Sequence, residues 1–289
     1  MCGEGNEVRL ARAALHFWEE PPISGESGSG TVFFSGCPLR CVYCQNKSIA
    51  RGEVGRGVSI ERLARIFLEQ QERGALNINL VTPTHFATQI KAALDLARSD
   101  AFSDTPLVLP IVYNTSGYER VEAVRELDDL VDIWLTDFKY ADAGLGRALS
   151  HVPDYPLVAQ SALIEMAHQL ERHGGGAARA DGTWTRGIIV RHLVLPGHAE
   201  DSCRVLDLIW DAVGDVPISV MNQYTPNAAM RAAGGELARA VTREEYERVL
   251  DHADDLGFTQ MFWQEGGAVD ESFTPPFDTT GVLERADAR

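Results

Sequence analysis

The chain lacks the features that would direct it to a membrane, out of the cell or onto a nucleic acid. It has no apolar run approaching the roughly 20 residues that span a bilayer. Its first residues mix acidic and basic side chains too early for a secretory signal. The net charge is -16, and a negative field of this size repels phosphate backbones. We therefore expect a cytoplasmic protein with neither a membrane nor a nucleic-acid partner, although a basic protein or a small cation is compatible with the charge.

A disulfide framework is also not expected. The 289 residues include five cysteines, and three of these stand in one cluster, unlike the paired cysteines of small secreted proteins. The thiols are therefore expected to be reduced. What the chain does have is an apolar fraction of 45%, which is enough for one large α/β barrel or for two ordinary domains.

Short apolar, β-branched runs alternate with amphipathic segments along the chain. The expected strands are 31–35, 77–81, 107–113, 133–137, 187–195, 218–224 and 259–263. The expected helices are 59–73, 84–99, 118–130, 156–173, 200–213 and 242–256. Two of these helices have clear start signals, an N-cap at Ser59 and a capping box formed by Thr242 and Glu245. This alternation predicts a parallel sheet, either a full or partial barrel or a doubly wound sheet, with its sites at the carboxyl ends of the strands.

The cysteine cluster directly follows the first of these strands. Residues 33–46 read FFSGCPLRCVYCQN and place Cys37, Cys41 and Cys44 at the spacing C-x3-C-x2-C. A structural zinc site takes four closed ligands, and no second cysteine pair stands nearby to complete one. A [4Fe–4S] cluster is usually held by four thiolates, so three would leave one iron open to another ligand. A cluster with an open position is the favoured interpretation, with zinc or a purely structural cluster as the alternatives.

The motif resembles that of the radical S-adenosylmethionine (radical SAM) superfamily, including the aromatic residue, Tyr43, before the third cysteine. The blocks NINLVTPTHF, WLTDFKY, IIVRHLVLPGH and ISVMNQYTP also resemble homologues of pyruvate formate-lyase activating enzymes. This resemblance implies a [4Fe–4S] cluster and S-adenosylmethionine as cofactors. It also implies that the cofactor is cleaved reductively to a 5′-deoxyadenosyl radical, which abstracts hydrogen from a substrate.

The resemblance also narrows the expected architecture. We expect an α/β fold that is a single-domain, partial (β/α)6 TIM-type barrel with parallel strands over residues 28–265. Residues 1–27 would be a short N-terminal extension and residues 266–289 a C-terminal tail or cover. Residues 173–184, which are rich in glycine, are expected to form a mobile loop before the fifth strand.

Two loops after strands are expected to approach the cofactor. The activating enzymes have a Gly-Gly-Glu loop after the second strand, where this chain reads VTPTH, so Thr82, assisted by Thr84 and Asn79, would supply acceptors instead. The simpler alternative is that Pro83 only starts a helix. After the third strand, Asn114 and Ser116 belong to a polar turn, YNTSG, that the resemblance places near the ribose and methionine. The alternative is an ordinary turn.

Charged residues in two further strands complete the expected site. Asp137 and Lys139 alternate onto one face of the fourth strand, and buried charges must pair or bind a ligand. A structural salt bridge is the alternative, whereas the resemblance makes both cofactor-site residues and gives Lys139 a catalytic role beside the cysteines. Arg191 interrupts an apolar strand and by resemblance approaches the cofactor's carboxylate. Tyr43 would pack on or near the adenine.

The remaining candidates carry less specific expectations. Gln223 or Tyr224 would close the pocket, and His85 would touch either substrate or cofactor. His192 and Cys203 are expected to be buried and inert. Cys2 is all that this chain has of the longer cysteine-bearing N-terminal segment found in many members of the group, so an auxiliary cluster built from this chain alone is not expected.

The substrate is open at this point. An electron donor of the flavodoxin or ferredoxin type is expected to reduce the cluster. The resemblance implies activation of a glycyl radical enzyme, and direct modification of a small molecule or peptide by the same radical is the second possibility. The third, from another class, is a non-catalytic metal-binding protein that chelates iron without cleaving the cofactor.

Overall fold

The computed structural model describes residues 5–264 and 274–283. Its ten-stranded sheet has the order β10-β9-β8-β6-β5-β4-β2-β1-β3, with the two-residue β7 paired to β8. The strands are β1 (Val8–His16), β2 (Ser29–Phe34), β3 (Arg56–Val58), β4 (Ile78–Val81), β5 (Ile111–Thr115), β6 (Ile133–Asp137), β7 (Ala177–Ala178), β8 (Trp184–Leu193), β9 (Ile218–Met221) and β10 (Met261–Trp263). Every pair from β2 through β10 along this order is parallel, so the fold is the expected α/β fold with a mostly parallel sheet, consistent with a partial TIM-type barrel.

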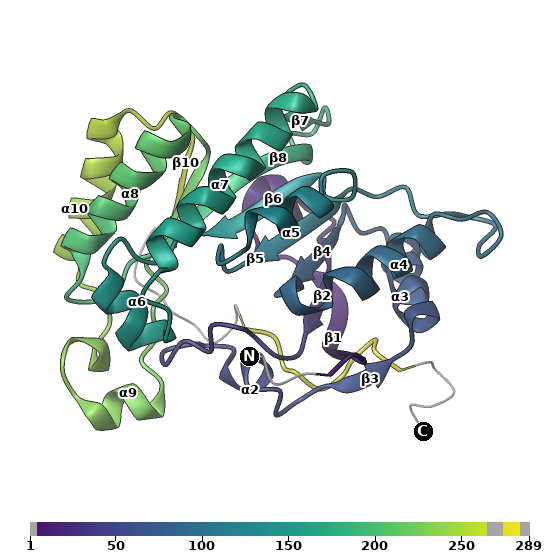
Figure 1. Ribbon diagram of the computed structural model, residues 1–289, viewed down its shortest axis with the longest axis horizontal. Coiled ribbons are helices and arrows are strands. Elements are labelled where there is room, and N and C mark those ends of the chain that lie inside the picture. The colour runs from purple at the N-terminus through teal and green to yellow at the C-terminus, as the bar shows by residue number, and fades with distance from the viewer. Residues whose placement is uncertain (1–4, 265–273, 284–289) are drawn as a thin grey trace.

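The longer helices, among them α3, α4, α7 and α8, lie along the outer side of this curved sheet (Figure 1). They are α1 (Pro21–Ser24), α2 (Lys47–Ala50), α3 (Ile60–Glu72), α4 (Ala87–Ala97), α5 (Val121–Glu126), α6 (Ala143–Ser150), α7 (Tyr155–Arg172), α8 (Ala199–Val213), α9 (Ala228–Ala233) and α10 (Arg243–Leu256), with 3₁₀ turns η1 (Thr84–Phe86) and η2 (Glu236–Ala238). Both predicted helix starts are confirmed. The Ser59 hydroxyl accepts a hydrogen bond from the Arg62 amide, and Thr242 and Glu245 form a complete capping box.

Several predicted element boundaries were wrong. The strand expected from Leu107 begins at Ile111, because Pro110 has no amide hydrogen to contribute to a ladder. The helix expected over 118–130 is only α5, since Arg120 before it has extended backbone. The glycine-rich segment 173–184, expected to be a mobile loop, contains β7, which pairs antiparallel with β8.

The two termini of the described chain pack against the sheet, which sequence periodicity did not predict. β1 runs antiparallel to β2 and gives the otherwise parallel sheet an antiparallel edge, to which β3 adds. Residues 274–283 run beside the edge of β1, where the Thr279 amide donates to the Ala11 carbonyl over 2.9 Å and the Ala13 amide donates to the Thr280 carbonyl over 2.8 Å. Val282 there is completely buried. In the described parts of the chain, no helix is long and apolar enough to cross a membrane.

The sheet separates two apolar layers, and this separation positions the site. Trp134 of β6 packs in the large cluster beneath the helices, whereas its neighbours Ile133 and Leu135 belong to a smaller cluster on the opposite face. That smaller cluster includes Ile23 of α1, which therefore covers the inner face of the barrel. A polar residue that stands two positions after one of these inner apolar residues in the sequence of a strand therefore lies inside the barrel, at the carboxyl end of that strand.

Candidate functional site

The cysteine loop is fixed in place by hydrogen bonds to distant segments. It leaves β2 at Gly36, whose φ of 86° lies in the left-handed region that glycine adopts without strain. The Val42 amide donates to the Leu149 carbonyl of α6 over 2.9 Å, and Asn227, the N-cap of α9, donates its side-chain amide to the Val42 carbonyl over 2.9 Å. The loop conformation therefore depends on segments more than a hundred residues away in the sequence.

The three clustered cysteines are free thiols, half-buried, and line one cavity of about 230 Å³. Seven further residues that the sequence assigned to the cofactor line the same cavity. These residues are Tyr43, Thr82, Asn114, Ser116, Asp137, Lys139 and Arg191. Gln223 and Tyr224 line it as well, whereas Asn79, Thr84 and His85 do not belong to its lining. The structure thus brings the predicted site together, although the role of each residue there stays a prediction.

Three polar residues of this cavity project from the inner face of neighbouring strands. Asn114, Asp137 and Arg191 each stand two positions after an apolar residue of the inner layer, Val112, Leu135 and Ile189. The period of two in a strand therefore places all three side chains inside the barrel, just above its apolar floor.

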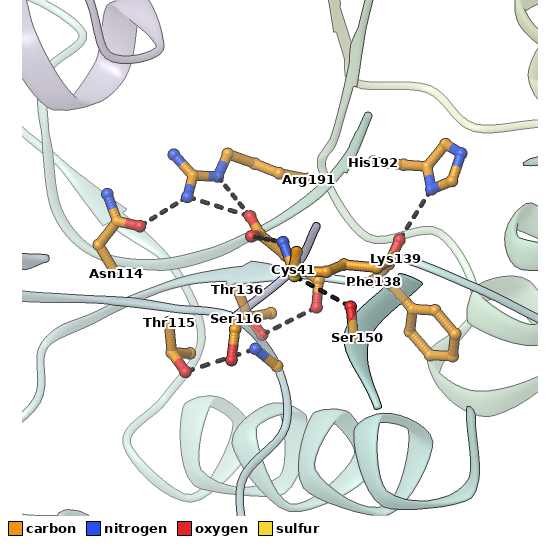
Figure 2. A network of polar contacts seen from close by, with 12 residues as sticks. Cys41, Asn114, Thr115, Ser116, Thr136, Phe138, Lys139, Ser150, Arg191 and His192 are labelled. Atoms are coloured by element: carbon orange, nitrogen blue, oxygen red, sulfur yellow. Dashed lines mark hydrogen bonds and ion pairs between the residues drawn. The ribbon is translucent and has the colours of Figure 1, made fainter. Parts of the chain in front are cut away.

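These side chains form one hydrogen-bonded ionic network with Lys139. The Asp137 carboxylate lies 2.5 Å from the Lys139 ammonium and 3.0 Å from the Arg191 guanidinium. Figure 2 shows the same guanidinium directed toward Asn114, whose Oδ1 it reaches over 2.5 Å. Burial alone would raise the pKa of Asp137, but the two cations hold it below its usual value. Asp137 is therefore ionised, and its carboxylate holds the Lys139 and Arg191 cations at the edge of the cavity.

The sequence missed a second carboxylate in this network, that of Glu19. It accepts a hydrogen bond from the Asn79 amide over 3.0 Å and lies 3.3 Å from the Arg191 guanidinium. Its side chain is only 10% exposed, and burial raises its pKa. Glu19 enters the barrel because β1 pairs with β2 and directs the following segment across the inner face. The sequence VRLARAALH of β1 gives only a weak strand signal, because an irregularity in the register between Leu10 and Arg12 interrupts the alternation of apolar and polar residues.

Thr82 lies at the cavity in an unusual backbone conformation. Its φ is 58°, in the left-handed region that a β-branched residue seldom adopts. The Thr82 amide donates to the Asn114 carbonyl over 2.9 Å, which ties the turn after β4 to the end of β5. Backbone strain of this kind persists only where the surroundings enforce it, and it is common at functional sites.

Glu119 also connects the turn after β4 to the end of β5, and sequence reasoning missed it too. Its Oε1 accepts hydrogen bonds from the hydroxyl groups of Thr84 and Thr115, both over 2.5 Å. The side chain is almost completely buried, and this burial raises the pKa of Glu119 to about 7. No motif marks this glutamate, because its partners come from two different turns.

A chain of hydroxyl groups leads from the core to one of the cysteines. The Ser150 hydroxyl donates to Cys41 Sγ over 2.9 Å, as Figure 2 shows, and is itself 2.7 Å from the Tyr140 hydroxyl. Tyr140 in turn lies 2.8 Å from the Tyr43 hydroxyl, and Tyr43 also packs beside Tyr224 with ring centroids 6.1 Å apart. The prediction for Tyr43 named only its ring, whereas its hydroxyl also belongs to this chain.

Two other sequence expectations concern residues away from the cavity. His192 is buried as expected, and its Nδ1 lies 2.7 Å from the Phe138 carbonyl. Cys203 is also buried, in α8 among apolar neighbours. Cys2 lies outside the described residues.

The three clustered thiols are donors of the kind that hold an iron–sulfur cluster. In residues 5–264 and 274–283, no group of three histidine, cysteine or acidic side chains is arranged to hold a single ion. A polynuclear cluster carries its ligands on separate iron atoms, so its thiolates stand further apart than those around one ion. Burial raises the pKa of the Cys44 thiol to about 12. Thiolates here therefore require added positive charge, which iron ions supply on binding.

Comparison with known proteins agrees with this donor set. The family model for the Radical SAM superfamily matches residues 31–147. This segment runs from β2 into α6 and contains the three clustered cysteines, Asp137 and Lys139, whereas Glu19 and Arg191 lie outside it. An uncharacterized protein of Methanocaldococcus jannaschii is 28% identical over 260 residues, covering 86% of this chain and 68% of that protein.

Proposed function

We propose that this chain, which carries a match to the Radical SAM superfamily over residues 31–147, is a radical SAM enzyme. The observation that carries the proposal is the shared cavity, in which three free cysteines meet the ionic network of Asp137, Lys139 and Arg191. The cavity opens at the carboxyl ends of parallel strands, where α/β barrels carry their active sites.

Cys37, Cys41 and Cys44 would hold the [4Fe–4S] cluster, and its open iron would bind S-adenosylmethionine. A reduced cluster held there would supply the electron for reductive cleavage of S-adenosylmethionine, and the resulting 5′-deoxyadenosyl radical would abstract hydrogen from the substrate. The side chains of the cavity would bind and orient the cofactor. Arg191 offers a planar guanidinium suited to a carboxylate, and Asp137 holds it in position. Lys139 places a positive charge near Cys41.

The barrel itself confines the reaction. A primary carbon radical reacts with any hydrogen donor nearby, so water and stray groups must be kept away. The apolar layer of Ile133, Leu135 and Ile189 closes the cavity from below, and α1 covers that layer with Ile23. Among the described residues, this apolar layer therefore closes the lower end of the cavity.

The recipient of the radical is the finer part of the proposal. One candidate is a glycine of a partner glycyl radical enzyme, whose flexible loop would enter the barrel. The other is a small molecule or peptide modified directly. A low-potential donor of the flavodoxin or ferredoxin type would reduce the cluster in both cases. The absence of any glycyl radical enzyme from the host genome would remove the first candidate.

An anaerobic assay tests the proposed chemistry. The chain is reconstituted with iron and sulfide, reduced with dithionite and supplied with S-adenosylmethionine. We expect 5′-deoxyadenosine and methionine as products, together with a change in the EPR signal of the reduced cluster when the cofactor binds. A complete cluster with no change in its EPR signal would contradict the proposal and favour a non-catalytic metal-binding protein.

A further inference from the structure

A second cavity lies directly beside the cysteine cavity, on the open side of the barrel. It has a volume of about 240 Å³ and lies between the segment that follows β1 and the ends of β9 and β10. The two cavities share Arg191, Met221 and Gln223, so only these side chains separate them. A molecule in the second cavity would therefore lie next to whatever occupies the first.

The side chains around this second cavity carry more negative than positive charge. Glu19 and Glu20 are two carboxylates, and Arg191 is the one cation among the described residues that line the cavity. Burial raises the pKa of both Glu19 and Glu20, although Arg191 opposes this effect. Holding both carboxylates ionised inside the barrel thus requires one more positive charge than the lining of this cavity contains.

Two buried oxygen atoms of residues that line the cavity also have no hydrogen-bond donor among the described residues. They are Oε2 of Glu20 and Oε1 of Gln264. The side-chain amide of Gln264 donates to Gln223, which leaves its own oxygen as the unpaired acceptor. Both atoms are acceptors, so the missing partner is a group with N–H donors.

The rim of the second cavity is aromatic. Trp18 and Trp263 line it with 59% and 54% of their surfaces exposed, and Phe17 beside them is 51% exposed. Large aromatic side chains with about half of their surface exposed at the mouth of an acidic cavity are suited to a cation, which is attracted to the faces of the rings. The charge, the unpaired acceptors and the rim therefore point to the same ligand chemistry.

We propose that the second cavity binds the substrate through an ammonium or guanidinium group, so that the substrate is a compact organic cation. This inference rests on the proposed radical SAM function, because only that function makes the bound cation a substrate. The binding itself does not depend on that chemistry. Glu20 and Gln264 would accept hydrogen bonds from the cationic group, and the remainder of the molecule would extend past Met221 toward the cysteine cavity.

Direct binding measurements test the proposal without any turnover. Isothermal titration of the anaerobically reconstituted full chain uses Nα-acetyl-lysine amide as the probe and its neutral analogue, Nα-acetyl-norleucine amide, as the comparison. We expect the cationic probe to bind at least tenfold more tightly than the neutral one. Glu20→Gln should weaken binding of the cationic probe at least tenfold. Glu26→Gln, which removes an exposed carboxylate of the same segment, is the matched control and should leave it unchanged.

Several results would overturn the proposal. These are equal affinity for the two probes, no binding of the cationic probe at millimolar concentration, or equal losses in the two glutamate variants. One-for-one displacement of the probe by S-adenosylmethionine would also overturn it, since the second cavity would then belong to that cofactor. If circular dichroism shows that Glu20→Gln does not fold, Gln264→Leu takes its place with the same expected loss. Because 5′-deoxyadenosine formation is measured separately, a failure of the proposed chemistry leaves this binding result intact.

Discussion

Asp137 and Arg191 stand directly opposite each other on the neighbouring parallel strands β6 and β8, and their side chains form an ion pair of 3.0 Å. The pairing register of the two strands therefore fixes the geometry of the charged network. A shift of one residue would turn one partner to the opposite face of the sheet. Lys139 then closes the network from the loop after β6, so two cations share one carboxylate.

Asp137→Asn should strongly destabilise the fold. The substitution leaves the Lys139 and Arg191 cations without their shared carboxylate in a largely buried setting, and breaking a buried pair in this way costs about 3 kcal/mol. Urea unfolding of the iron-free chain measures the loss. Glu247→Gln breaks the exposed Arg243–Glu247 pair and should leave the unfolding curve unchanged. Equal stability of Asp137→Asn and the unmodified chain would show that the network does not stabilise the barrel.

Replacing any one of the three clustered cysteines should abolish the cluster. Cys37→Ala, Cys41→Ala and Cys44→Ala each remove one of the three predicted thiolate ligands. We expect reconstituted samples to lose the visible absorbance and the iron content of the cluster, with no 5′-deoxyadenosine formed. Cys203→Ala, in the buried face of α8, is the control and should keep both. A variant of the cluster motif that retained full iron and activity would refute the ligand assignment.

Ser150→Ala should lower the reduction potential of the cluster. The hydroxyl of Ser150 donates to Cys41 Sγ, and a hydrogen bond to a ligand sulfur stabilises the more negative, reduced form. Its loss should make the potential more negative by roughly 50 mV, equivalent to about 1 kcal/mol for one electron. An EPR-monitored redox titration measures the shift. Ser161→Ala, on the exposed side of α7, should leave the potential unchanged, and equal potentials for all three proteins would contradict the prediction.

The buried Glu119 should make stability depend on pH near neutrality. Its pKa rises from 4.5 to about 7 on folding, so the folded chain holds a proton that the unfolded chain releases between these values. The contribution of this bound proton to the free energy of unfolding is fully present below pH 4.5 and is lost as the pH rises through 7. This contribution is about 3 kcal/mol.

Glu119→Gln tests this dependence, because glutamine stays neutral throughout. The difference in unfolding free energy between the unmodified chain and Glu119→Gln should shift by about 2 to 3 kcal/mol in favour of the variant between pH 5 and pH 8. Glu122 is an exposed neighbour on α5, and the unfolding free energy of Glu122→Gln should change with pH in the same way as that of the unmodified chain. Parallel curves for both variants would mean that Glu119 titrates normally.

The sequence by itself determined the parallel sheet and the residues at the ends of its strands. Continuous apolar runs such as IWLTD identify strands buried on both faces, and the period of two then places Asp137 and Lys139 on one side. The spacing of the three cysteines after the first of these strands indicated that a site lies at the end of that strand. These features are local, so a single sequence contains all that is needed to infer them.

The tertiary structure alone decided which distant segments complete the site. Glu19 and Glu20 enter the barrel because β1 pairs antiparallel with β2, and the pattern of β1 was not enough to reveal that pairing. Glu119, Tyr140 and Ser150 gain their roles from partners in other turns and helices. Contacts between residues far apart in the sequence depend on how the elements pack, and no local periodicity encodes that packing.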